Sequence, residues 1–75
     1  MQIDKEINAR GLNCPLPLMK AKKAMSEMQS GQVLRVIATD SGSMRDFLAF
    51  AKQSGNEMIA QTVEGKDYIH TMRHS

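Results

Sequence analysis

Hydrophobic residues recur along this chain with two different spacings, and these spacings predict helices in some segments and strands in others. Residues 15–29 repeat apolar side chains every three or four positions, which is the pattern of an amphipathic helix, and residues 43–54 do the same. Residues 33–38 are rich in aliphatic and β-branched side chains and predict a central strand. Weaker strand patterns cover residues 2–7, 58–64 and 66–72. The first of these has isolated isoleucines among charges and is typical of an edge strand.

The order of the predicted elements is βαβαββ, and the residues at their ends fit this order. Gly55 suits the C-terminal end of the second helix, and Ser43 suits its N-cap, with Asp46 completing a capping pattern. Gly65 separates the last two strands and predicts a hairpin. Two helices packed on one face of a four-stranded mixed sheet would bury both apolar stripes. We therefore expect a single α/β (α+β) domain over residues 1–75, built as a two-layer sandwich.

The composition excludes several classes of protein. One cysteine in 75 residues cannot form an internal disulfide, and one cysteine with two histidines is too few for a structural zinc site. No apolar run approaches the roughly 20 residues of a membrane span, and residues 1–6 lack the apolar stretch of a signal peptide. We therefore expect a cytoplasmic protein without metal or cofactor. A net charge of +2, with two phenylalanines and one tyrosine, does not favour direct nucleic-acid binding.

The strongest chemical signal is a cysteine directly before a Pro-X-Pro sequence at the predicted start of the first helix. Pro15 fits the first helical position, and Pro17 is tolerated in the same turn. Cys14 is then expected at the N-cap, at the positive end of the helix dipole. The N–H of Leu16 and the nearby cation Arg10 could also face the sulfur. These groups would stabilise a thiolate and lower the cysteine pKa, which makes the thiol reactive. The alternative is a small buried structural cysteine.

The absence of neighbouring catalytic groups in the sequence limits the reactions that Cys14 can carry out. Without a second cysteine it cannot run a dithiol cycle. His70 and His74 are distant in the sequence and are expected to be exposed strand or tail residues. A hydrolytic Cys-His pair stays open if the last strand approaches the first helix. A nucleophile with no resolving partner suits transfer of a group between proteins, in which one partner loads Cys14 and another unloads it.

Residues 11–17, Gly-Leu-Asn-Cys-Pro-Leu-Pro, make the chain similar to the TusA family (also called SirA or YedF) of small sulfur-carrier proteins. The similarity continues through residues 18–24, 31–34 and 38–46, and thus spans nearly the whole chain. The resemblance implies a βαβαββ sandwich and a sulfurtransferase in which Cys14 accepts sulfane sulfur as a persulfide and donates it again. It also implies that the Cys-Pro-X-Pro residues shape the start of the helix; here these are Pro15, Leu16 and Pro17.

The resemblance further implies partners and pathways. A cysteine desulfurase, a rhodanese or a DsrE-type sulfurtransferase would be the donor, and another sulfurtransferase or a DsrC-like protein the acceptor. The carrier would be a monomer in transient complexes, without membrane contact or direct nucleic-acid contact. Family members serve tRNA thiolation, molybdenum cofactor synthesis and dissimilatory sulfur oxidation. Members that act in tRNA thiolation typically have Glu between the two prolines, whereas Leu16 in this chain resembles the sulfur-oxidiser type.

Residues outside the motif are candidates for contacts around the cysteine. Asp40 and Arg45 flank the turn after the central strand, where they would frame the sulfur or touch a partner. A turn-forming aspartate and an exposed helix cation are the alternatives. Asp46 is expected to cap the second helix rather than to take part in chemistry.

Two surfaces near the cysteine are expected to meet partner proteins. The first is an apolar rim formed by Leu12, Leu16 and Met19. The second is a basic patch on the first helix, formed by Lys20, Lys22 and Lys23. Such a patch would steer an acidic partner, although a solvated face is the alternative. A second candidate function is a binding module without covalent chemistry, which would contact RNA or a regulatory protein through the sheet or the lysines.

Overall fold

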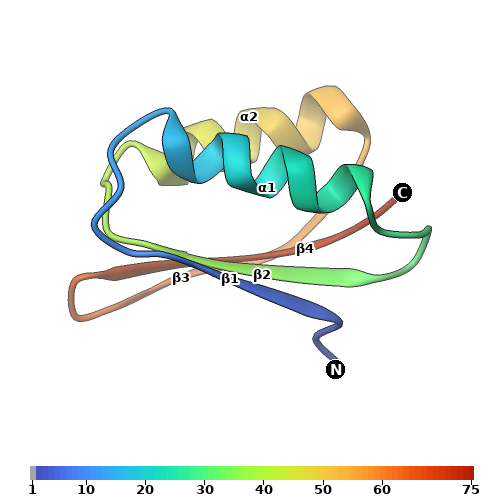
Figure 1. Ribbon diagram of the computed structural model, residues 1–75, viewed down its shortest axis with the longest axis horizontal. Helices are drawn as coiled ribbons and strands as arrows, with labels where there is room; N and C mark the ends of the chain where they lie inside the picture. Colours follow the sequence, from blue (N-terminus) through green and yellow to red (C-terminus); the bar gives the residue numbers. More distant parts are fainter. Residues whose placement is uncertain (1) are drawn as a thin grey trace.

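The computed structural model describes residues 2–75 and has the predicted element order βαβαββ (Figure 1). The elements are β1 (Lys5–Ala9), α1 (Leu16–Ser26), β2 (Val33–Ala38), α2 (Ser43–Ser54), β3 (Glu57–Glu64) and β4 (Asp67–Arg73). Both helices lie on one face of the sheet (Figure 1), so the predicted two-layer α/β sandwich is confirmed. Neither α1 nor α2, the helices of the described chain, has the length and apolar character of a membrane span.

The four strands form one mixed sheet in the order β1-β2-β4-β3. β1 and β2 are parallel, in register from Lys5 opposite Leu34 to Ala9 opposite Ala38. β4 is antiparallel to both β2 and β3, and β3 and β4 form the predicted hairpin. β1 lies at an edge of the sheet, as its weak hydrophobic pattern predicted. The parallel pair needs a crossover, and α1 supplies it.

The core lies between the helices and the sheet and uses the apolar faces that the spacing predicted. Phe47 of α2, Leu34 and Val36 of β2 and Met72 of β4 are fully buried. Ala21 of α1 is fully buried too, and its small side chain lets this helix lie close to the sheet. The alternation within β2 and the helical repeat within α2 thus meet in one cluster.

α1 ends at Ser26, before the predicted end at Gln29. The backbone N–H of Gln29 donates to Oε1 of Gln32 at 2.9 Å, and the N–H of Gln32 donates to the Gln29 carbonyl at 3.1 Å. These bonds hold a turn around Gly31, whose φ of 86° is incompatible with a right-handed helix. A turn closed by these two bonds therefore stands where the sequence predicted the last turn of the helix.

β1 covers Lys5–Ala9 instead of the predicted residues 2–7. The parallel pairing with β2 continues as far as Ala9, which is fully buried opposite Ala38. The predicted strand stopped at residue 7 because the small side chain of Ala9 adds little to a pattern of hydrophobic positions. The loop to α1 therefore starts at Arg10.

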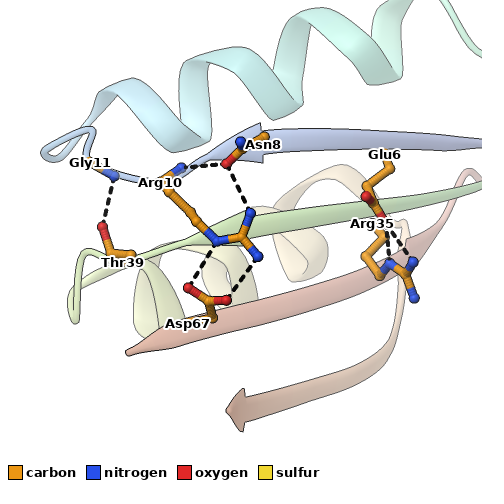
Figure 2. Close-up of polar contacts among 7 residues, drawn as sticks. All are labelled: Glu6, Asn8, Arg10, Gly11, Arg35, Thr39 and Asp67. Atoms are coloured by element: carbon orange, nitrogen blue, oxygen red, sulfur yellow. Dashed lines mark hydrogen bonds and ion pairs between the residues drawn. The ribbon is translucent and has the colours of Figure 1, made fainter. Parts of the chain in front are cut away.

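Ion pairs connect strands of the sheet (Figure 2). Arg10 Nε and Nη2 donate to the two carboxylate oxygens of Asp67 at 3.0 and 2.9 Å, which joins the end of β1 to β4 across β2. Arg35 of β2 pairs with Glu6 of β1. These side chains are partly exposed, so solvent screening keeps the contribution of each pair to stability small. Asp67 holds the Arg10 guanidinium at the sheet, so the cation that the sequence suggested as a neighbour of Cys14 is engaged elsewhere.

Candidate functional site

Two loops on the same side of the sheet bring Cys14 next to the start of α2. The parallel strands β1 and β2 end side by side, so the loops that follow them lie close together. The backbone N–H of Gly11 in the first loop donates to Oγ1 of Thr39 in the second, at 2.9 Å (Figure 2). Gly11 has a φ of 79°, a conformation that glycine adopts without strain. This turn directs the chain toward α2 before it enters α1.

The start of α1 differs from the prediction by one residue. Pro15 is the N-cap and Leu16 the first helical residue, so Cys14 lies just before the cap. The backbone N–H of Leu16 donates to the carbonyl of Asn13 at 2.9 Å and is therefore not directed to the sulfur. Pro17 lies in the first turn, as predicted, and it is buried there. The expected N-cap position of Cys14 is wrong, because the non-helical φ and ψ of Pro15 (−100° and 18°) delay the helix.

Cys14 is exposed, and its thiol donates a hydrogen bond to a carboxylate of α2. Sγ lies 3.2 Å from Oδ2 of Asp46. This hydrogen bond stabilises the protonated thiol and is the main reason why the pKa of Cys14 is raised. The charges of Asp46 and Asp40 act in the same direction, whereas Arg45 opposes them. The predicted lowering of the pKa is wrong, because two carboxylates outweigh the cation and the expected Leu16 donor is engaged elsewhere.

α2 begins without the side-chain cap that the sequence predicted. Gly42 is its N-cap, and neither Ser43 nor Asp46 caps the helix. The backbone N–H of Asp46 donates to the Gly42 carbonyl at 3.1 Å, while its carboxylate turns to Cys14. Ser43 is buried, and its hydroxyl bonds to the ring of His70 in the core instead. Both polar side chains therefore serve contacts between distant segments, and the capping prediction is wrong.

The surface at Cys14 is a shallow hollow above the core. The thiol, the Asp40 side chain and the buried ring of Phe47 line it, and it has no room for a water-sized molecule. A substrate therefore cannot be enclosed beside the sulfur. A reactant has to approach from the exposed side of Cys14, as a group on a partner protein would.

Asp40, one of the two residues that the sequence suggested near the cysteine, lies beside the thiol. Its Oδ2 is buried and has no hydrogen-bond partner among the described residues. Sγ of Cys14 and one carboxylate oxygen each of Asp40 and Asp46 lie within 4.8 Å of one another. Three such groups are close enough for one cation, but the S–H hydrogen bond alone accounts for the Cys14–Asp46 contact. We therefore interpret the cluster as a thiol flanked by two carboxylates.

A buried histidine lies under the start of α2. The ring of His70 stacks on Phe47 with centroids 4.2 Å apart, and both side chains are fully buried. Gln61 Nε2 donates to the Met44 carbonyl at 2.7 Å and to His70 Nδ1 at 3.2 Å. Because Nδ1 accepts, the neutral ring carries its proton on Nε2, which donates to Ser43 Oγ at 2.9 Å. Burial lowers the pKa of His70 to about 4.

The expectation that His70 is exposed is therefore wrong. The period-two pattern of β4 could have revealed its burial, because His70 stands two residues before the buried Met72 and shares its face. His74 follows β4 and is partly exposed, as expected for a tail residue. In the described part of the chain, neither histidine has a hydrogen bond to Cys14, so the hydrolytic Cys-His pair is not formed.

The fold and the exposed cysteine motif can be compared with known proteins. The family model described as sulfurtransferase TusA matches residues 5–74. The chain belongs to the TusA family. A sulfur carrier protein TusA from Allochromatium vinosum is 54% identical over 72 residues, which cover 96% of this chain and 95% of that protein. A sulfur carrier protein TusA from Pseudomonas entomophila is 40% identical over 70 residues, 93% of this chain and 88% of that protein.

The fold of this TusA-family chain is also that of a solved structure. The crystal structure of a SirA-like protein from Desulfitobacterium hafniense superposes with a TM-score of 0.83. It is 25% identical in sequence and covers 92% of this chain and 95% of that one. The predicted resemblance to the TusA and SirA family is thereby confirmed.

The apolar rim predicted for this TusA-family chain is exposed at the start of α1. Leu16 is 46% exposed and Met19 is 57% exposed, so both side chains are accessible to a partner protein. Leu12 is half-buried and packs against the core. Leu16 and Met19 are thus exposed on the first turn of α1, shortly after Cys14 in the chain.

The three lysines of α1 do not form one patch. Lys20 and Lys23 line a surface groove between α1 and β1. Lys22 Nζ lies 5.8 Å from the ring centroid of Phe50, a residue of α2. The predicted basic patch is therefore divided between two sides of α1, with Lys20 and Lys23 together.

Proposed function

We propose that Cys14 accepts sulfane sulfur from a donor protein as a persulfide and passes it to a cysteine of an acceptor protein. Membership of the TusA family supports a sulfur-transfer role for the chain. The observation that carries the finer proposal is an exposed cysteine at the Cys-Pro-X-Pro motif without an enclosed pocket. Such a thiol can be reached by another protein's sulfur, whereas a small molecule would find no site to hold it.

In loading, the thiolate of Cys14 attacks the outer sulfur of the donor's persulfide. An S–S bond forms at Cys14, the donor's S–S bond breaks, and its electron pair stays on the donor sulfur as a thiolate. Unloading repeats this exchange, with Cys14 persulfide as the donor. Sulfane sulfur moves from protein to protein without net oxidation or reduction.

The remaining residues of the proposed site frame this exchange. Pro15 and Pro17 hold the start of α1, and Asp40 and Arg45 place opposite charges near the sulfur. The apolar rim would contact the partner, and the neighbouring lysines would steer an acidic partner toward it. These partner-contact residues are Leu12, Leu16, Met19, Lys20 and Lys23.

A cysteine desulfurase, a rhodanese or a DsrE-type sulfurtransferase would load the carrier, and another sulfurtransferase or a DsrC-like protein would unload it. We propose that the carrier acts as a cytoplasmic monomer in transient complexes. Its sulfur would enter dissimilatory sulfur oxidation or biosynthetic thiolation. Leu16 between the two prolines favours the first of these pathways, because members of the family that act in tRNA thiolation typically have Glu there.

Intact-protein mass spectrometry tests the proposal. After incubation with inorganic polysulfide and removal of the excess, the protein should gain the mass of one sulfur atom, and dithiothreitol should remove it. Protein whose cysteine is first blocked with iodoacetamide is the control and should gain nothing. A folded protein with a free thiol that never gains sulfur would show that Cys14 is not a carrier.

Replacing Leu16 with glutamate should separate partner contact from chemistry. Leu16→Glu places a charge on the exposed rim, so transfer from a rhodanese or a cysteine desulfurase should weaken by about fivefold or more. Loading by polysulfide should stay at the wild-type level, because the small donor does not need the rim. The matched control is Val63→Glu, at an exposed aliphatic residue of β3 (56% exposed). If both variants transferred sulfur between proteins at the same rate, Leu16 would not be part of the partner interface.

A further inference from the structure

The side chain of Asp46 is free to act in the reaction. α2 starts at Gly42 without a side-chain cap, so the carboxylate is not used to begin the helix. It instead accepts the S–H of Cys14 at 3.2 Å, and the sulfur is the reacting atom of the proposed relay. The contact joins residues 32 positions apart, so it depends on the packing of the β1–α1 loop against α2.

The charged groups that face the sulfur come from α2 and from the loop before it. They are the carboxylates of Asp46 and Asp40 and the guanidinium of Arg45. Asp40 Oδ2 is buried without a hydrogen-bond partner in the described structure, so no donor offsets its charge there. Two negative charges against one positive charge favour the neutral form of the sulfur and disfavour an anion at the same place.

We propose that Asp46 sets how readily Cys14 gives up its sulfur, an inference that rests on the proposed persulfide relay. The empty cysteine is a neutral thiol that donates its proton in a hydrogen bond to Asp46. The loaded cysteine is a persulfide, which is more acidic than a thiol and is mainly an anion at neutral pH. That anion has no proton for Asp46 and is repelled by both carboxylates. The site therefore stabilises the empty carrier over the loaded one and favours delivery.

The delivery step balances in atoms and electrons. The acceptor's thiolate attacks the outer sulfur of Cys14 persulfide in its protonated form, and a new S–S bond forms on the acceptor. The S–S bond at Cys14 breaks, and its electron pair stays on Sγ. Sγ then takes a proton from water and donates it in the hydrogen bond to Asp46. The outer sulfur leaves with its own proton, so the step needs no oxidant and no reductant.

The first test measures the rate at which iodoacetamide alkylates the protein at pH 7.5. The chain has one cysteine, so every reaction event reports on Cys14. Because the thiol is exposed, slow reaction in the native protein reflects protonation and not access. We expect the native protein to react about tenfold more slowly than the same chain in urea, because the hydrogen bond to Asp46 and the nearby carboxylates favour the protonated thiol. Native protein that reacts as fast as the unfolded chain would overturn the inference without any variant.

Asp46→Asn removes the charge at nearly constant shape. This variant should react with iodoacetamide about tenfold faster than the wild type at pH 7.5. Asp46→Glu keeps a carboxylate and should react at a rate near that of the wild type. Asp67→Asn is the matched control, because Asp67 is engaged with Arg10 at the sheet. An Asp46→Asn rate equal to the wild-type rate would contradict the assignment.

The second test measures how strongly each protein holds sulfur. Wild type and Asp46→Asn are equilibrated with glutathione persulfide and glutathione, and the loaded fraction is quantified by intact mass. We expect the equilibrium constant for loading to be about tenfold larger in Asp46→Asn. Equal constants would overturn the role of Asp46 and leave the relay intact. Absence of loading in both proteins would refute the relay, and the inference with it.

Discussion

Replacing Cys14 with serine should abolish sulfur transfer and leave the fold intact. Serine has the same shape and can donate the same hydrogen bond to Asp46, but its hydroxyl neither forms a persulfide nor attacks one at neutral pH. The residue is exposed, so the free energy of unfolding should stay close to that of the wild type. Transfer of radiolabelled sulfane sulfur from a loaded rhodanese to an acceptor through the carrier should fall to the rate without carrier.

The thermal unfolding midpoint of Cys14→Ser, measured beside the wild type, shows whether the variant is folded in that assay. Relay at the wild-type rate by a folded Cys14→Ser protein would rule out a covalent mechanism. The alternative of a binding module without covalent chemistry would then become the leading hypothesis, because it predicts that this substitution has no effect.

Acidification from neutral pH should destabilise the domain through His70, whose buried ring has a lowered pKa. The pKa of this ring is about 4 in the folded protein and 6.5 in an ordinary setting. Between these values the unfolded chain binds a proton that the folded chain does not, so stability falls as pH drops. The full contribution is present above pH 6.5 and is lost by about pH 4. The shift corresponds to a loss of at most about 3 kcal/mol, a large share of the stability of a small domain.

Urea unfolding at a series of pH values between 7 and 4 measures this loss. His70→Gln should be less stable at pH 7, since it loses the stacking on Phe47, but it should have a much flatter dependence on pH. His74→Gln leaves the buried cluster untouched and should keep the wild-type decline. If His70→Gln does not fold, NMR of the wild type decides: ring protons of His70 that show protonation above pH 5.5 would contradict the prediction.

The sequence was sufficient to predict the helices and strands whose hydrophobic positions repeat at a regular spacing. The helical repeat of α2 led to the buried Phe47, and the aliphatic run of β2 became the central strand with Leu34 and Val36 inside. Gly55 ends α2 with a φ of 79°, as its place after the apolar repeat predicted. Such features depend on neighbours three or four residues away, or on the alternation of one strand, and both are visible in the sequence.

Polar side chains were the residues that local rules placed wrongly. Ser43 and Asp46 have the spacing of a helix cap, yet Ser43 bonds to His70 and Asp46 to Cys14. Each contact spans 27 or 32 residues and saturates a polar group at or near the core. A buried or partly buried polar group needs a partner more than an exposed helix end needs a cap, because water can serve the helix end.

The sequence by itself determined the βαβαββ order and the cysteine motif of a TusA-family protein. Only the tertiary structure decided the chemical state of that cysteine. The parallel pairing of β1 and β2 places the loops that follow them side by side, so Cys14 meets the carboxylates of Asp46 and Asp40. The hydrogen bond to Asp46 and the charges around Sγ, which come from distant parts of the chain, therefore raise the pKa of the thiol and favour its protonated form.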